Sequence, residues 1–253
     1  MEQSVEIPRR YRMEPGWKAA LIAVGGYFAI LAAGWWVTDA EASAVTIAEL
    51  FRMLTIEFFV GTVFLVAFVK WLNWEAVWRD PERLGMSTLY WWVAALIVLS
   101  ALLRLDGAVG SNLYADELLW IAAFSALIGV NEELLFRGIW LRSMRVSCRG
   151  EGRAVIYTCA AFGVFHLANI VIGEPGSGIE QVLSAAVLGI GLYLWRRGTT
   201  WIFPAMLVHG LWDYAFLVND NDFGPPEPGN VAIINLLTLA AFLTSVIAAQ
   251  RLW

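Results

Sequence analysis

Three apolar stretches of this sequence each carry ionisable residues of the kinds that activate water. Residues 131–137 read Asn-Glu-Glu-Leu-Leu-Phe-Arg, residues 162–166 read Phe-Gly-Val-Phe-His, and residues 209–213 read His-Gly-Leu-Trp-Asp. Both histidines of the chain fall within these stretches. An ionisable side chain costs roughly 2.5–3.5 kcal/mol at the centre of a bilayer on insertion scales, so an apolar helix that keeps one usually uses it. We therefore take the three stretches as the candidate functional site.

The first stretch places two carboxylates and a guanidinium on one helix. Glu133 and Arg137 are four residues apart, so they can pair along one helical face. Glu132 points about 100° away from Glu133, because an α-helix has 3.6 residues per turn. The spacing predicts that Arg137 neutralises Glu133 while Glu132 stays available. A glutamate in that position is suited to general acid–base catalysis.

The second and third stretches each place a histidine on a helical face with a partner. Phe162 and His166 are four residues apart, and Asn169 follows almost one turn later. His209 and Asp213 are also four residues apart. A carboxylate at that distance along a helix can accept a proton from one imidazole nitrogen and so fix the tautomer. Asp213 could therefore orient His209, or the two could form only a helix-stabilising pair.

Packing of the three helices against one another would bring four of these side chains to one hydrated cavity. They are Glu132, His166, His209 and Asp213, and are called the candidate quartet below. Such a set can activate a water molecule and stabilise an oxyanion. Taken singly, each motif also has a structural reading, either as an ion pair within one helix or as a hydrogen bond between helices.

The composition predicts an all-α, polytopic membrane helix bundle. Of the 253 residues, 59% are hydrophobic and only 15% are charged, and the mean hydropathy is +0.64. A spanning helix needs about 20 mostly apolar residues. We expect a single integral membrane domain, 1–253, whose motif-bearing core covers about 117–218. The eight expected spans are 17–37, 54–72, 88–104, 117–141, 153–172, 180–196, 201–218 and 231–250.

The distribution of basic residues predicts the orientation of these spans. With Arg137 counted as buried, 14 of the other 16 lysines and arginines of the sequence fall on the side of the N-terminus. Cytoplasmic loops carry such an excess. The expectation is therefore an integral protein of the cell (inner) membrane, with both termini in the cytoplasm. No basic run of the kind that binds nucleic acid is present.

The connection after the second span is predicted to lie on the membrane surface. Trp71, Trp74 and Trp78 recur at i, i+3 and i+7 beside basic residues. This spacing places three indoles on one helical face, as in an amphipathic interfacial helix.

The three motifs, taken in order, resemble those of the CPBP family of intramembrane endopeptidases. Here they read Glu-Glu-x-x-x-Arg from residue 132, Phe-x-x-x-His from residue 162 and His-x-x-x-Asp from residue 209. The family includes the CAAX prenyl proteases and bacteriocin-processing or bacteriocin-immunity proteins. The resemblance covers the stretch from Glu132 to Asp213 and implies a glutamic-type endopeptidase.

The resemblance also implies a role for each matched residue. Glu132 and His166 would activate the attacking water. His209 and the residue four positions later would stabilise the tetrahedral oxyanion. Glu133 and Arg137 would support the site.

At position 213 the chain differs from the CAAX-processing members, which carry asparagine. Asparagine can donate a hydrogen bond to an oxyanion, whereas an ionised aspartate cannot. Asp213 must therefore be protonated or must orient His209, or else the activity is altered. The wider family motif allows aspartate, so the difference bears mainly on the CAAX substrate.

The resemblance implies an intramembrane endopeptidase that cuts a membrane-associated peptide or protein at or near the lipid bilayer, and it favours a route without a metal cofactor. A zinc ion held by Glu132, His166 and His209 is the alternative mechanism, because two histidines and a carboxylate are adequate zinc ligands. Two other functions stay open. One is a non-catalytic bacteriocin-immunity or scaffold protein that uses the same cavity, and the other is a transporter or channel that relays protons.

Overall fold

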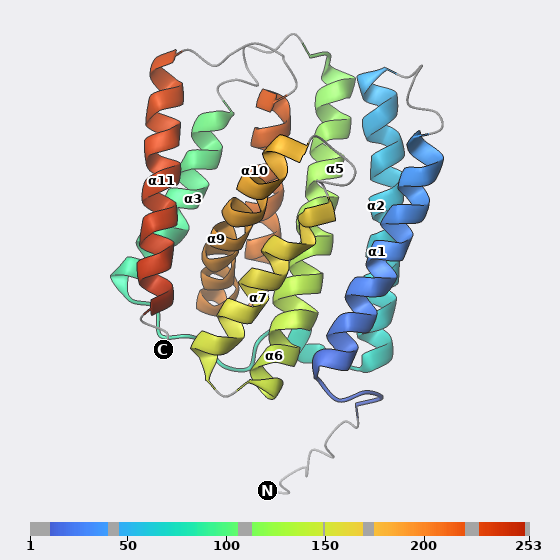
Figure 1. Cartoon of the computed structure of the whole chain (residues 1–253), viewed down its shortest axis with the longest axis vertical. Helices are drawn as coiled ribbons and strands as arrows, with labels where there is room; N and C mark the ends of the chain where they lie inside the picture. The colour runs from blue at the N-terminus through green and yellow to red at the C-terminus, as the bar shows by residue number, and fades with distance from the viewer. Residues whose placement is uncertain are drawn as a thin grey trace, which may run out of the picture.

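The structure, a computed structural model, is an all-α bundle. It describes residues 11–39, 46–105, 113–148, 150–168, 175–220 and 228–250 (Figure 1). The helices are α1 (Trp17–Asp39), α2 (Ile47–Leu72), α3 (Thr88–Arg104), α5 (Ala115–Glu133), α6 (Leu141–Ser147), α7 (Glu151–Phe165), α9 (Pro175–Thr199), α10 (Phe203–Asp220) and α11 (Pro228–Gln250). A 3-10 turn, η2 (Glu75–Val77), follows α2, and a π-helix, η3 (Leu134–Trp140), joins α5 to α6.

Eight helical segments result in the described part of the chain, because α5, η3 and α6 form one continuous run. Each expected span has a counterpart among them. Three segments, 17–34, 47–72 and 115–147, are long and apolar enough to cross a membrane. Three shorter helices, 88–104, 203–218 and 236–248, are also apolar. The chain is therefore an integral membrane protein.

The second span begins seven residues earlier than expected, because a capping box starts it. The hydroxyl of Thr46 accepts a hydrogen bond from the backbone N–H of Glu49, and the Glu49 carboxylate accepts one from the backbone N–H of Thr46. These bonds satisfy two of the N–H groups that a helix start leaves open. Because the first turn of α2 is polar, the run of apolar residues alone places the start of this helix too late.

The predicted surface helix around the three tryptophans is wrong. Asn73 ends α2 in the left-handed conformation, with φ 61°, and only the short turn η2 follows. Trp74 is buried, and its indole N–H donates to the carbonyl of Met13 at 2.9 Å. The left-handed cap turns the chain away from the helix axis, so the i, i+3, i+7 face cannot form.

Helices α5 and α10 cross at two glycines. A Cβ atom built on Gly129 would lie 2.5 Å from the carbonyl oxygen of Met206 and 2.7 Å from the backbone nitrogen of Gly210. A Cβ atom on Gly210 would lie 3.1 Å from the carbonyl oxygen of Ser125. Small residues let membrane helices approach this closely. The crossing lies only a few residues from Glu132 and His209 and holds these two side chains close together.

Enlarging Gly129 is expected to force this crossing apart. Because the Cβ of Gly129→Ala would meet backbone atoms, the helices must separate, and we expect a loss of about 1–3 kcal/mol in unfolding free energy. Gly25→Ala in α1 is the matched control, because no atom lies within 4 Å of its added Cβ. Unfolding in detergent micelles measures both. Equal stability of the two variants would contradict the close crossing.

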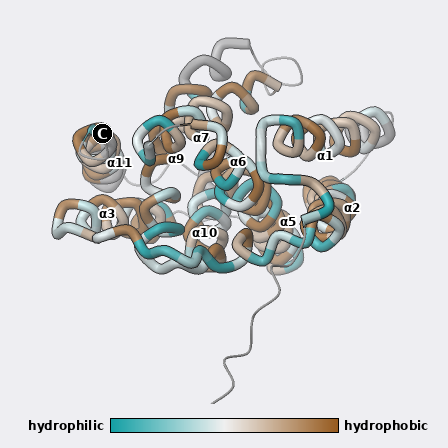
Figure 2. The backbone as a smooth tube through the Cα atoms, turned by 90° about the horizontal axis from the view of Figure 1, so that it is seen from below, coloured by the Kyte–Doolittle hydropathy of each residue, from teal (hydrophilic) through white to brown (hydrophobic). Residues whose placement is uncertain are grey.

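An ionic cluster joins four segments at one end of the bundle. This is the end where α1 starts and α11 ends, and hydrophilic residues gather there (Figures 1 and 2). Asp80 accepts hydrogen bonds from Arg145 at 2.9 Å and forms an ion pair with Arg197 at 2.8 Å. Glu151 also binds both guanidinium groups.

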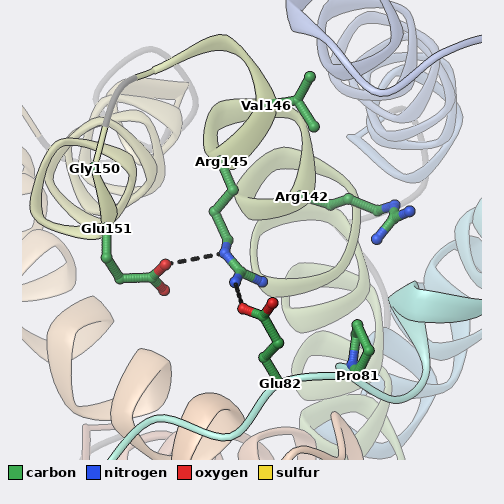
Figure 3. A pocket seen from close by; sticks show the side chains of 7 residues that line it. All are labelled: Pro81, Glu82, Arg142, Arg145, Val146, Gly150 and Glu151. Atoms are coloured by element: carbon green, nitrogen blue, oxygen red, sulfur yellow. Dashed lines mark hydrogen bonds and ion pairs between the residues drawn. The ribbon is translucent and has the colours of Figure 1, made fainter.

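A cavity of about 390 Å³ lies beside this cluster. Arg145, one of its lining residues, reaches between Glu151 and Glu82 (Figure 3). The guanidinium of Arg142, which also lines the cavity, donates to the hydroxyl of Tyr11 at 2.7 Å. These arginines are occupied by partners within the chain. The cluster therefore fastens the loop before α3 to α6, α7 and α9.

Candidate active site

The candidate quartet meets where α5, α7 and α10 face one another. Oxygen Oε2 of Glu132 lies 4.0 Å from Nε2 of His166 and 3.7 Å from Nε2 of His209. Oδ2 of Asp213 lies 3.5 Å from the same nitrogen of His209. The four side chains that the sequence singled out therefore surround one point, at separations somewhat longer than a direct hydrogen bond.

Each imidazole is held by a hydrogen bond at Nδ1, so Nε2 faces the quartet. Nδ1 of His166 donates to the carbonyl oxygen of Phe162 at 2.8 Å. Nδ1 of His209 donates to Oε1 of Glu133 at 2.9 Å. Because a carbonyl and a carboxylate can only accept here, both Nδ1 atoms carry a proton. Both Nε2 atoms are left for chemistry.

The tautomer of His209 is therefore fixed at Nδ1, on the side away from Asp213. Glu133, from the neighbouring helix, performs that task. Asp213 is on the same helix as His209 and reaches the side of Nε2, at a distance too long for a hydrogen bond. The close crossing at the glycines turns Nδ1 of His209 toward α5 instead.

The ion pair between Glu133 and Arg137 forms as the spacing predicted. The carboxylate and the guanidinium are 2.7 Å apart, and both side chains are fully buried. Glu133 is the last residue of α5, and the π-helix η3 begins at the next residue. Single π-helical turns within α-helices occur often at functional sites. Arg137 thus holds the carboxylate that in turn orients His209.

Phe162 supports both histidines through its ring. Its plane is nearly perpendicular to those of His166 and His209, at ring-centre distances of 4.9 and 5.7 Å. The guanidinium of Arg137 lies over the same ring at 4.2 Å. The ring of Phe162 therefore lies between the guanidinium of Arg137 and the two imidazoles. Asn169, the remaining candidate from the sequence, lies outside the described residues.

A cavity of about 460 Å³ opens beside the quartet. Phe162, His166, His209 and Asp213 line it, together with residues of α3, α9, α10 and α11. Small-molecule sites have volumes of about 300–1,000 Å³. The cavity is therefore large enough for water and a small ligand in contact with His166, His209 and Asp213, whereas Glu132 is not among its lining residues.

Sequence reasoning did not give Asn131 a role, although it precedes Glu132 in the first motif. Its side chain is fully buried. Oδ1 accepts a hydrogen bond from the Thr62 hydroxyl at 2.6 Å, and Nδ2 donates to the carbonyl of Phe58 at 2.8 Å. These bonds fasten α2 to α5 one residue before Glu132. The position of Asn131 directly before the first motif is a sign of a role in the site. Spacing along one helix cannot identify its partners on α2.

The alternative of a zinc site can be compared with this geometry. Among the residues that the structure describes, no three His, Cys, Asp or Glu side chains are arranged to hold a metal ion. At a tetrahedral zinc ion with bonds of about 2.0–2.2 Å, neighbouring donor atoms lie roughly 3.3–3.6 Å apart. Oε2 of Glu132 lies 4.0 Å from Nε2 of His166 and 3.7 Å from Nε2 of His209, a few tenths of an ångström farther.

One comparison with known proteins covers all three motifs. A sequence model of the family described as "Type II CAAX prenyl endopeptidase Rce1-like" matches residues 114–215. This range contains all three motifs and runs from the start of α5 into α10. No curated protein and no solved structure matches the chain. The resemblance of the motifs is thus confirmed, and residues 114–215 form a domain of the Rce1-like type II CAAX prenyl endopeptidase family (CPBP).

Proposed function

We propose that this protein is an intramembrane glutamic-type endopeptidase that hydrolyses a peptide bond in a membrane-associated peptide or protein. The observation that carries the proposal is the convergence of one carboxylate oxygen and two imidazole Nε2 atoms within 4.0 Å, beside a cavity in an apolar bundle. The cost of keeping such groups inside a membrane favours a chemical role over a structural one.

Glu132 acts as the general base in the proposed reaction. Separations of 3.7 and 4.0 Å between its Oε2 and the two Nε2 atoms suit a bridging water molecule. Glu132 takes a proton from this water while the oxygen attacks the carbonyl carbon of the substrate. His166 orients the same water. The proton then passes to the leaving amine as the carbon–nitrogen bond breaks, which balances the hydrolysis.

His209 stabilises the oxyanion of the tetrahedral intermediate. Its Nδ1–H is fixed on Glu133, so an Nε2–H can be aimed at the cavity when the ring is fully protonated. A preformed donor of this kind is among the strongest contributions to acyl-transfer catalysis. Asp213, 3.5 Å from Nε2, supports the positive charge of the ring rather than contacting the oxyanion as a donor.

The second candidate function is a non-catalytic member of the family that acts in bacteriocin immunity or as a membrane scaffold. The observation that favours it is the carboxylate of Asp213, which lies 3.5 Å from Nε2 of His209 and, when ionised, cannot donate a hydrogen bond to an oxyanion. Such a protein would bind a peptide in the same cavity and leave it intact. Incubation of membrane peptides with the protein in liposomes separates the two functions, because only the first yields cleaved products.

We also propose that all eight helical segments cross the membrane as one domain, with both ends in the cytoplasm. The start of α1 and the end of α11 lie at the same end of the bundle, as an even number of crossings requires (Figure 1). The arginines of the ionic cluster lie at that end too. An excess of arginine marks the cytoplasmic side, which supports a cell (inner) membrane location.

Hydrolysis is expected to survive the removal of metal ions. The proposed water activation uses Glu132 and His166, so treating the purified protein with EDTA and 1,10-phenanthroline should leave the cleavage rate within about twofold of its starting value, far less than the loss of one catalytic group. Mass spectrometry of peptides released in proteoliposomes measures this rate. Loss of activity that added Zn²⁺ restores would instead establish the zinc mechanism.

A further inference from the structure

Part of the wall of the 460 Å³ cavity comes from two helices outside the family domain. These are α3 and α11, which lie side by side at one edge of the bundle (Figures 1 and 2). Helix α3 contributes Arg104, and α11 contributes Thr238 and Phe242. The matched domain covers residues 114–215, so the family motifs say nothing about these side chains. What they offer to a bound molecule is a property of this chain.

Arg104 gives the cavity a permanent positive charge. Among the described residues that line the cavity, it is the only lysine or arginine. Its guanidinium lies over the ring of Trp212, 5.6 Å from the ring centre, and such a contact holds a cation in place. Trp212 directly precedes Asp213, so a molecule that contacts the candidate quartet can reach the guanidinium within the same cavity. An arginine is costly to keep in an apolar bundle, which favours a role in binding an anion.

The hydroxyl of Thr238 is a second polar group on this wall. Threonines in helices commonly donate to the carbonyl four residues earlier, and five others in the described chain do so, namely Thr55, Thr62, Thr158, Thr199 and Thr244. Oγ1 of Thr238 is buried, yet it has no hydrogen-bond partner within the part of the chain that the structure describes. A buried hydroxyl without a partner is costly. Threonine uses two χ1 rotamers in a helix, so this hydroxyl can turn to an acceptor in the cavity.

We propose that Arg104 and Thr238 form a subsite for a carboxylate of the peptide substrate. A guanidinium binds a carboxylate at two points through its planar set of N–H donors, and the threonine hydroxyl donates one further hydrogen bond. The carboxylate belongs either to an acidic side chain or to the C-terminus of the peptide. The rings of Phe216 and Phe242, which line the same cavity, suit apolar residues beside it. That the bound peptide is also cleaved rests on the proposed endopeptidase function, whereas the binding of the carboxylate does not.

The test compares forms of one apolar peptide that differ only in charge, with the protein in phosphatidylcholine nanodiscs. The reference form has neutral side chains and a C-terminal carboxamide. A second set carries one glutamate, moved along the peptide, and a third form has a free C-terminal carboxylate. We expect a carboxylate form to bind, and to be cleaved, roughly 10- to 100-fold better than the reference, the effect of one charge-assisted hydrogen bond. The form that gains identifies the source of the carboxylate.

Variants of the two residues test whether they cause this preference. Arg104→Gln should reduce it to within about twofold, because the amide lacks the charge. Arg104→Glu should reverse it in favour of peptides with lysine in place of glutamate, which a purely structural role would not produce. Thr238→Val should weaken binding of the carboxylate form by roughly fivefold. Thr244→Val is the matched control in α11, because its hydroxyl donates to the carbonyl of Ala240, and it should bind as the wild type does.

Fluorescence anisotropy of labelled peptides measures binding without any need for cleavage. Equal affinity of the wild type for the neutral and carboxylate forms would overturn the proposal, and this comparison needs no variant to fold. A full preference in folded Arg104→Gln would overturn it too. An effect of Arg104 on the binding of phosphatidylglycerol, with no preference among peptides, would assign the charge to a lipid instead. A carboxylate preference in binding without any cleavage would uphold the subsite and refute only the proposed function.

Discussion

Glu132→Gln should abolish peptide hydrolysis while the bundle stays folded. Glutamine has nearly the same shape as glutamate, but its amide cannot accept a proton from the attacking water. Loss of a general base costs roughly 10²–10⁴-fold in rate. We expect cleavage in proteoliposomes to fall to background, with the unfolding midpoint in detergent close to that of the wild type.

Glu57→Gln is the matched control for this result. Glu57 is also a glutamate of an apolar helix, in α2, and is about half-buried. It lies on α2, outside the three helices that carry the motifs, so its amide variant should cleave peptides at close to the wild-type rate. Wild-type rates in Glu132→Gln would contradict the assignment of the base. Equal losses in both variants would show that any membrane glutamate affects the fold.

Arg137→Met should destabilise the protein by about 3–5 kcal/mol, because it leaves the Glu133 carboxylate buried without its cation. Both side chains of this pair are fully buried. The methionine retains the apolar part of the side chain, so the loss reports mainly on the charge. Arg52→Met, at an exposed arginine of α2, should change the stability by less than about 0.5 kcal/mol. Denaturant unfolding of the detergent-solubilised protein measures both.

Combining Arg137→Met with Glu133→Gln separates stability from chemistry. The double variant removes the uncompensated charge, and we expect most of the lost stability to return, since neutral replacements of buried ion pairs are often tolerated. Activity should stay low, because the imidazolium of His209 no longer has a carboxylate at Nδ1. Full activity in the double variant would show that the ion pair serves the fold alone.

Local features of the sequence were enough to predict the helices and one of the site's ion pairs. The lengths of apolar runs predicted segments that correspond to all eight helical segments of the described chain. The four-residue spacing of Glu133 and Arg137 predicted their pairing, because neighbours on one helix are fixed by helix geometry alone. Both results depend on residues close together in the chain.

Contacts between distant residues could not be predicted in the same way. The hydrogen bond from His209 to Glu133 depends on how closely α5 and α10 approach, which Gly129 and Gly210 determine. A pattern within α10 suggested Asp213 for that role instead. The hydrogen bonds of Asn131 with Thr62 and Phe58 likewise depend on the packing of α2 against α5, which no pattern within one helix predicts.

In the proposed function, the carboxylate of Glu132 activates the water that cuts peptides in the membrane. The most direct measurement is a comparison of peptide termini in membranes from cells that carry the wild type or Glu132→Gln at equal abundance. We expect a defined set of new termini, within or beside apolar segments, in the wild type only. Identical termini in the two membranes would contradict it.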